Sequence, residues 1–347
     1  MEARSHPALV PFSALFGMGA RLRLLLYRRG VLAVRRLSRP VISVGNLTVG
    51  GSGKTPMVDY LASCIASSGG QVSILSRGYR GSFPGKVQVV CRGRGPLVPP
   101  SVCGDEPFLL ARNHPAAMVV VGKKRYECGL VSESQLPKCV HLLDDGYQHI
   151  CLERQSNILL MDARDPFGGR RLLPAGRLRE PLSAIRRATL VCLTRVPPSG
   201  PPAGLVDEIR RYHPHVPVLL SWHEPAGFAG GRDAELLPPQ AFRGAPAVAF
   251  AGIARPSAFF SQLEELGIEL RRRISFPDHH AYTPKDIGRI RRECMDSGAR
   301  LLVTTEKDEV KIAEPGGLEL PLWFLKIRVR IEPEEPLPRM LRELESA

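Results

Sequence analysis

A glycine-rich segment between an apolar stretch and an amphipathic one constrains the fold of this chain more than any other feature. Residues 41–46 are apolar and predict a strand, and the turn that follows ends in Gly53-Lys54-Thr55. Beyond it, apolar residues recur at helical spacing up to a glycine stop at 69 and 70, namely Met57, Val58, Leu61 and Ile65. A strand, a glycine turn, Lys-Thr and a helix in this order predict a phosphate-binding loop, in which backbone N–H groups and the helix N-terminus face an anion.

The loop departs from the usual G-x-x-x-x-G-K-[ST] pattern, because Thr48 stands at the first glycine position and Gly50 and Gly51 are additional glycines. The strand and the helix still lie where the mechanism needs them, which favours nucleotide binding over an ordinary glycine-rich turn. In such a loop the lysine reaches the outer phosphates and the threonine hydroxyl ligates magnesium. We therefore expect one continuous segment to bind the phosphates of ATP: Thr48, Val49, Gly50, Gly51, Ser52, Gly53, Lys54 and Thr55.

The chain is strongly basic, with a formal net charge of +14 over 347 residues. This excess predicts attraction to an anionic partner, and composition leaves nucleic acid, an acidic membrane surface and a phosphorylated substrate all open. Its 44% hydrophobic and 24% charged residues are typical of a soluble globular chain. The eight cysteines are scattered without a C-x-x-C pair, which indicates a reducing compartment rather than a disulfide framework.

The N-terminal segment 7–20 is apolar but too short to span a bilayer, and its arginines follow the apolar run, whereas a secretory signal places them before it. If residues 15–29 are helical, one face is apolar and arginines flank it; the apolar residues are Leu15, Met18, Leu22, Leu25 and Leu26. Such a helix either lies in a membrane interface, with its arginines on anionic headgroups, or packs on the protein's own core. The pattern alone leaves both interpretations open.

Apolar stretches alternate with amphipathic ones, which predicts an α/β fold with a mostly parallel sheet. The expected strands are 41–46, 71–75, 118–121, 139–143, 157–161 and 189–193, followed by 247–251 and 301–304. The length predicts roughly two domains. Prolines and glycines become frequent between 197 and 239, around a strand at 216–221, so we expect domains at 1–220 and 221–347.

Two carboxylates, Asp144 and Asp145, directly follow the expected strand at 139–143. In α/β enzymes with a phosphate loop, a strand that ends in aspartate supplies the carboxylate that holds magnesium, directly or through water. We therefore expect Thr55 and either or both aspartates to form a Mg²⁺ site.

Other polar segments admit more than one interpretation. Asp105, in Gly-Asp-Glu-Pro, is most simply the N-cap of a helix. Arg77 and Arg80 lie in a basic loop that either holds phosphate oxygens or is solvated. The long irregular loop 165–181 is of a length that is usually functional. Three histidines lack an acid or thiol at metal-ligand spacing and are interpreted as surface residues: His213, His215 and His223.

The motifs of the chain occur in a distinctive order: Val-Gly-Asn-Leu-Thr-Val-Gly-Gly-Ser-Gly-Lys-Thr-Pro, Ser-Arg-Gly-Tyr-Arg-Gly, Gly-Asp-Glu-Pro, Asp-Asp-Gly-Tyr-Gln-His, Leu-Leu-Pro-Ala-Gly-x-Leu-Arg-Glu-Pro, Phe-Pro-Asp-His-His and Thr-Thr-Glu-Lys-Asp. In this order they resemble the tetraacyldisaccharide 4′-kinase family of lipid A biosynthesis. The resemblance runs from the N-terminal apolar segment to about Lys311, and a threonine at position 48 is typical of the family.

The resemblance implies a kinase that transfers the γ-phosphoryl group of ATP, with Mg²⁺, to the 4′-hydroxyl of a tetraacyldisaccharide 1-phosphate and so forms lipid IVA. It implies a peripheral protein on the cytoplasmic face of the bacterial inner membrane. Its partners would be the lipid substrate and the membrane surface, with no nucleic acid and no obligate protein partner. The implied fold has two α/β/α sandwich domains, the first like that of P-loop NTPases, joined by a short two-stranded link with the active site in the cleft.

The same resemblance assigns roles to residues of this chain. The base would be Asp105 working with a histidine from the second domain, for which we favour His279 over His280, while Lys54 stabilises the transferred phosphoryl group. The substrate would contact residues spread over several motifs: Asn46, Arg77, Tyr79, Glu106, Arg125, Gln148, His149, Arg179 and Glu180.

Two other classes of protein fit parts of the pattern. A P-loop regulatory NTPase acting at the membrane surface, such as a GTPase or a metallochaperone, would need a guanine-specificity motif or a metal-ligand cluster. Thr-Thr-Glu-Lys-Asp at 304–308 is spaced differently from the guanine motif. A nucleic-acid-binding ATPase would suit the charge, but it would need a recognised module or interleaved aromatic residues, and aromatics are only 6% of the chain.

Overall fold

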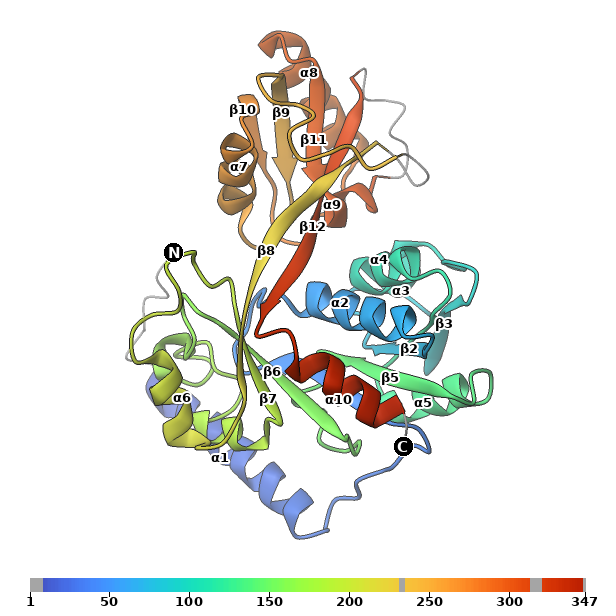
Figure 1. Ribbon diagram of the computed structural model, residues 1–347, viewed down its shortest axis with the longest axis vertical. Helices are drawn as coiled ribbons and strands as arrows, with labels where there is room; N and C mark the ends of the chain where they lie inside the picture. The colour runs from blue at the N-terminus through green and yellow to red at the C-terminus, as the bar shows by residue number, and fades with distance from the viewer. Residues whose placement is uncertain (1–8, 231–234, 313–319, 346–347) are drawn as a thin grey trace.

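The computed structural model describes residues 9–230, 235–312 and 320–345. It shows two lobes that are joined by a long two-stranded ribbon (Figure 1). A single sheet of twelve strands runs through the described residues, in the order β10-β9-β11-β12-β8-β7-β6-β1-β5-β2-β4-β3. Neighbouring strands are parallel except for the pairs β3–β4 and β8–β12.

The first lobe contains the larger part of the sheet: β1 (Val41–Asn46), β2 (Gln71–Ser76), β3 (Val87–Arg92), β4 (Met118–Gly122), β5 (Cys139–Asp144), β6 (Ser156–Asp162) and β7 (Leu190–Thr194). Its helices are α1 (Val10–Arg28), α2 (Lys54–Ser67), α3 (Pro100–Cys103), α4 (Asp105–Asn113), α5 (Arg125–Glu133), α6 (Leu205–Tyr212) and the short η2 (Gly168–Arg170) and η3 (Leu182–Arg187). Every residue of β1, β5 and β6 is buried, because helices cover both faces of this parallel sheet.

The second lobe contains β9 (Pro246–Ala251), β10 (Glu269–Ser275), β11 (Leu301–Thr305), α7 (Pro256–Glu265), α8 (Pro284–Ser297) and α9 (Glu306–Glu309). Alternate residues of β9 pack on opposite sides, Ala249 with Phe260 of α7 and Phe250 with Ile290 of α8. This period of two is the pattern expected of a strand between two helical layers. The predicted fold class is therefore confirmed: both lobes are α/β/α sandwiches.

The ribbon between the lobes consists of β8 (Val218–Ala229) and β12 (Leu322–Glu332), which pair antiparallel from Ala229↔Phe324 to Leu220↔Glu332. The predicted boundary at 220 falls inside β8. After β12 the chain returns to the first lobe. There Leu337 and Leu341 of α10 (Pro336–Glu345) pack into the apolar core. The division at 220 therefore places α10 in the wrong lobe, because composition marks a linker but does not show that the chain crosses it twice.

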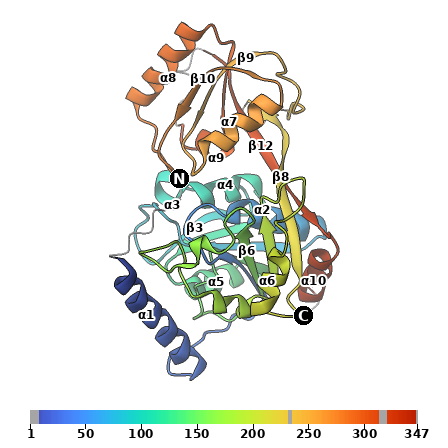
Figure 2. The same cartoon turned by 90° about the vertical axis from the view of Figure 1, so that its left-hand side faces the viewer.

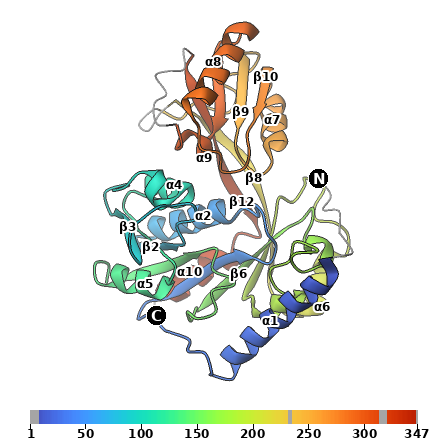
Figure 3. The ribbon, with the colours of Figure 1, turned by 180° about the vertical axis from the view of Figure 1, so that it is seen from behind.

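Helix α1 lies on the outside of the first lobe (Figures 2 and 3). It docks through its small residues: the Ser13 hydroxyl donates to the Leu172 carbonyl at 2.9 Å, and a Cβ on Gly17 would lie 2.6 Å from Leu172 Cδ1. Large apolar side chains elsewhere on the helix are exposed, among them Phe12, Leu15, Met18, Leu22 and Leu25. Of the two interpretations that the sequence left open, packing of the apolar face on the protein core is therefore wrong.

Candidate active site

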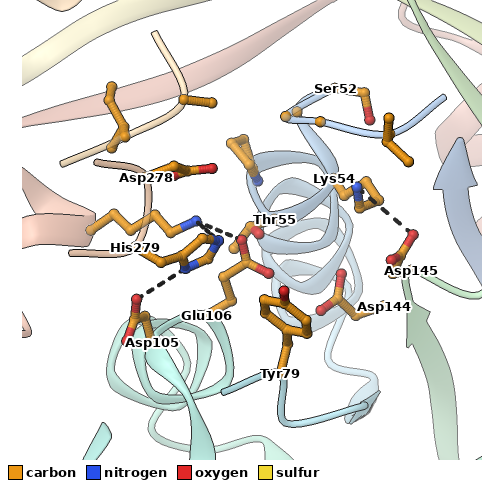
Figure 4. Close-up of a pocket in the computed structure, with 18 of the residues that line it drawn as sticks. Ser52, Lys54, Thr55, Tyr79, Asp105, Glu106, Asp144, Asp145, Asp278 and His279 are labelled. Carbon is orange, nitrogen blue, oxygen red and sulfur yellow. Dashed lines mark hydrogen bonds and ion pairs between the residues drawn. The ribbon is translucent and has the colours of Figure 1, made fainter. Parts of the chain in front are cut away.

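A cavity of about 1560 Å³ lies in the cleft between the lobes. The first lobe contributes the phosphate loop, the start of α4, the ends of β2 and β5, and part of α1. The second lobe contributes segments around Arg255, His279 and Lys307. Figure 4 shows side chains from both lobes pointing toward the N-terminus of α2.

The phosphate loop connects the buried strand β1 to helix α2 as predicted. Gly53 has φ +82° immediately before the first residue of α2, a left-handed conformation that favours glycine. The loop is fixed from outside: Thr194 Oγ1 donates to the Ser52 carbonyl at 3.1 Å, and Arg195 Nη1 donates to the Gly51 carbonyl. Residues 49–55 line the cavity, whereas Thr48 pairs with Leu178 and does not. The structure thus brings residues 49–55 of the expected phosphate-binding segment to the cavity but not Thr48, and the binding of phosphates stays a prediction.

Asp144 and Asp145 lie at the end of β5 in different environments (Figure 4). Asp144 is buried, its Oδ2 accepts from Ser76 Oγ at 2.9 Å, and its Oδ1 has no hydrogen-bond partner. Burial, with Glu106 and Asp145 nearby, raises the pKa of Asp144 to about 6.

Asp145 is instead paired with cations. It accepts from Arg179 Nη1 at 3.0 Å and lies 3.7 Å from Lys54 Nζ. Burial would raise the pKa of Asp145, but Lys54 and Arg179 outweigh that effect and hold it below its usual value. The unpartnered oxygen of Asp144 is therefore the better candidate ligand for a cation that also meets the Thr55 hydroxyl.

Asp105 and His279 approach each other from the two lobes (Figure 4). Asp105 Oδ2 lies 3.1 Å from His279 Nδ1. The cap of α4 is Gly104, and Asp105 makes no side-chain capping bond, so the interpretation of Asp105 as an N-cap is wrong. Burial would raise the pKa of Asp105, but the hydrogen bond with His279 and the charges of Lys311 and Lys307 lower it below its usual value.

The two adjacent histidines face different partners. His279 has φ +57°, and its backbone is held by Gly252 and by Arg80, whose Nη1 donates to the His279 carbonyl at 2.8 Å. His280 Nε2 lies 3.0 Å from Asp286 Oδ2, and its ring stacks on Phe276 inside the second lobe. The structure therefore places His279, rather than His280, against Asp105.

Most of the expected substrate-binding residues line the cavity: Arg77, Tyr79, Glu106, Arg125, Gln148, His149, Arg179 and Glu180. Three of them are already in ion pairs, Glu106 with Lys307, Glu180 with Arg187 and Arg179 with Asp145. Asn46 is the exception. Its side chain is fully buried, neither amide atom has a hydrogen-bond partner, and it does not line the cavity, so a direct contact with substrate is not supported.

Sequence reasoning missed some residues of the cavity. His223 was expected at the surface, but it lines the cavity, and its Nε2 would lie 3.6 Å from a Cβ on Gly53. Burial, with Arg195 and Arg164 nearby, lowers the pKa of His223 to about 4. The sequence around His223 does not indicate this position, because where the side chain points depends on the path of β8 between the lobes. Lys307 lay in a motif that the sequence singled out, yet it was given no role.

This geometry can be compared with known proteins. A family model described as tetraacyldisaccharide-1-P 4′-kinase matches residues 5–345. The chain belongs to this family. As a family member it is a kinase of lipid A biosynthesis. This membership argues against a P-loop regulatory NTPase and against a nucleic-acid-binding ATPase.

Individual members of the tetraacyldisaccharide 4′-kinase family are similar to this chain along nearly their whole length. A tetraacyldisaccharide 4′-kinase of Pelobacter propionicus is 47% identical over 97% of this chain and 91% of its own length. One of Geobacter sulfurreducens is 44% identical over 94% of this chain and 89% of its own length. The crystal structure of LpxK from Aquifex aeolicus in complex with ATP superposes with a TM-score of 0.78, at 34% identity over 97% of this chain and 98% of that one.

Proposed function

We propose that this protein transfers the γ-phosphoryl group of ATP to the 4′-hydroxyl of a tetraacyldisaccharide 1-phosphate within the cleft between its lobes. One observation carries the assignment of residues: Lys54 and Asp105 of the first lobe line the same cavity as His279 of the second lobe, which contacts Asp105. Phosphoryl transfer needs both a site that stabilises the migrating phosphoryl group and a base for the attacking hydroxyl.

Residues 49–55 would bind the phosphates through backbone N–H groups and the N-terminus of α2. Lys54 would neutralise charge on the β- and γ-phosphates as the bond to the leaving group breaks. The donor set of Thr55 and Asp144 fits Mg²⁺, which usually takes one or two protein ligands together with phosphate oxygens and water. When bound, Mg²⁺ would neutralise phosphate charge.

Asp105 would accept the proton of the 4′-hydroxyl as the new P–O bond forms. His279 Nδ1 of the second lobe lies 3.1 Å from Asp105 Oδ2, and a hydrogen bond to this ionised carboxylate would fix its orientation. The lowered pKa of Asp105 keeps it ionised, and so able to accept a proton, at neutral pH.

The acyl chains of the substrate would lie toward α1. Phe16, Gly19, Ala20 and Arg23 of α1 line the cavity, and the same helix carries exposed apolar side chains. None of the described helices is both long enough and apolar enough to cross a bilayer. We infer that α1 lies in the membrane interface on the cytoplasmic face of the inner membrane, with arginines such as Arg21 and Arg28 on anionic headgroups.

Replacing Leu15, Leu22 and Leu25 with serine tests this interface. All three side chains are exposed, so we expect the melting temperature to stay within a few degrees while binding to anionic vesicles weakens about tenfold or more, given roughly 1.5–3 kcal/mol per fully buried leucine. The apparent KM for lipid should rise more than the KM for ATP. Leu130→Ser on α5 removes an equally exposed leucine and should change neither. Unchanged vesicle binding of the triple variant would exclude α1 as the membrane contact.

The reaction itself is tested by incubating the protein with γ-labelled ATP, Mg²⁺ and detergent-dispersed tetraacyldisaccharide 1-phosphate. Label in a lipid-soluble product that depends on the disaccharide supports the assignment. Release of labelled phosphate without a labelled lipid would instead indicate a regulatory NTPase at the membrane surface.

A further inference from the structure

Lys307 of α9 in the second lobe reaches across the cleft to Glu106 and also contacts His279 of its own lobe. Its Nζ donates to Glu106 Oε1 of the first lobe at 2.7 Å and lies 3.3 Å from His279 Nε2. Burial would lower the pKa of Lys307, but Glu106 outweighs burial and the pKa lies above its usual value, so the side chain is an ammonium at neutral pH. Lys307 is therefore a fixed cation beside the ring that contacts Asp105.

The contacts of His279 determine where its proton lies. An ammonium only donates hydrogen bonds, so His279 Nε2 must accept from Lys307 and carries no proton. An ionised carboxylate only accepts, so Nδ1 carries the ring proton and donates it to Asp105 at 3.1 Å. Both partners select the same neutral tautomer of the imidazole.

Other charged groups around His279 act in opposite directions. Asp105 of α4 contacts the ring, and Glu106 and Asp278 bring further negative charge close to the Lys307 ammonium. Lys307 of α9 contacts the ring and Arg80 the His279 carbonyl, while Lys311 lies near Asp105. Tyr79 meets the ring edge-on at a centroid distance of 5.9 Å. Without Lys307, the Asp105 carboxylate would be the charged group left in contact with a ring nitrogen, and the partner that requires an unprotonated Nε2 would be gone.

We propose that Lys307 is a positioning residue that keeps His279 neutral with its proton on Nδ1, while Glu106 anchors the Lys307 ammonium. This inference rests on the proposed function, because it concerns the base of the same phosphoryl transfer. A neutral imidazole donates one hydrogen bond to Asp105 and leaves its carboxylate basic. An imidazolium would pair with the carboxylate as an ion and weaken it as a proton acceptor.

The first test is the pH dependence of kcat in Lys307→Met, which removes the charge and keeps a similar length. We expect the acidic limb of the profile to move to higher pH by about one unit, the low end of the effect of a nearby charge. The loss should therefore be about tenfold at the low-pH side and small at high pH. Lys307→Arg keeps a cation and should restore the position of the limb.

Lys326→Met is the matched control. Lys326 also pairs with α9, at 3.4 Å from Glu306, but it makes no contact with His279, so its pH profile should match that of the wild type. An equal loss at every pH in Lys307→Met would overturn the proposal, because it would indicate phosphate binding or a purely structural role.

A second measurement needs no catalysis. Two-bond ¹H–¹⁵N spectra of the substrate-free full chain, with the His279 signals assigned by their loss in His279→Gln, should show a protonated Nδ1 and a bare Nε2. In Lys307→Met, both nitrogens should be protonated at a pH where the wild type is still neutral. A wild-type ring protonated on Nε2 would overturn the role of Lys307. Absence of lipid phosphorylation with this spectrum intact would overturn only the proposed function.

Discussion

We expect Lys54→Met to lose about a hundredfold to a thousandfold in kcat and still to fold. The lysine lies at the start of α2, beside the site where the β- and γ-phosphates are expected, and removal of one preorganised charge-stabilising group typically costs 10²–10³-fold. Arg179 still pairs with Asp145 in the variant, so the neighbouring carboxylate keeps a cation and the melting temperature should shift by only a few degrees. Single-turnover rates and thermal melts measure the two effects separately.

Lys86→Met is a suitable control for this variant. Lys86 is an exposed lysine of the first lobe outside the cavity, and its loss should leave both rate and stability unchanged. Near-normal turnover of Lys54→Met would mean that the glycine-rich loop is structural and does not bind the phosphates of ATP.

We expect Asp105→Asn to lose at least about a hundredfold in kcat, the low end of the contribution of a general base. Its melting temperature should stay within a few degrees of the wild type, because Gly104, and not the Asp105 side chain, caps α4. His279→Ala should behave similarly, and the double variant should be no slower than the slower single variant. Additive losses would indicate that the two residues do not act as a unit.

Asp286→Asn is the matched control for Asp105→Asn, because it should affect stability and not rate. Asp286 also contacts a histidine, His280, at 3.0 Å, but it lies in a capping box with Thr283 at the start of α8. Hydrogen bonds from Thr283 lower the pKa of Asp286 to about 2. We expect this variant to lower the melting temperature and keep kcat. Loss of rate in Asp286→Asn would contradict the choice of His279 over His280.

The sequence alone predicted the elements around the phosphate loop and the nature of the chemistry, but not the strands β3, β10 and β12 or the helix α10. Strand β1, the glycine turn and helix α2 were predicted because hydrophobic period, glycine conformations and helix stops are local properties of the chain. The position of Asp144 and Asp145 at the end of β5 was predicted for the same reason, since parallel strands end at the same edge of their sheet. Motif order then indicated the family.

The tertiary structure decided which side chains meet. Asp105 and His279 are separated by 174 positions, and their contact depends on how the β8–β12 ribbon places one lobe over the other. The same placement turns His223 toward the phosphate loop and Lys307 toward His279. Burial of Asn46, exposure of the apolar side of α1 and the return of α10 likewise depend on packing between distant segments. Local sequence encodes which element forms, whereas these contacts are set by the path of the whole chain.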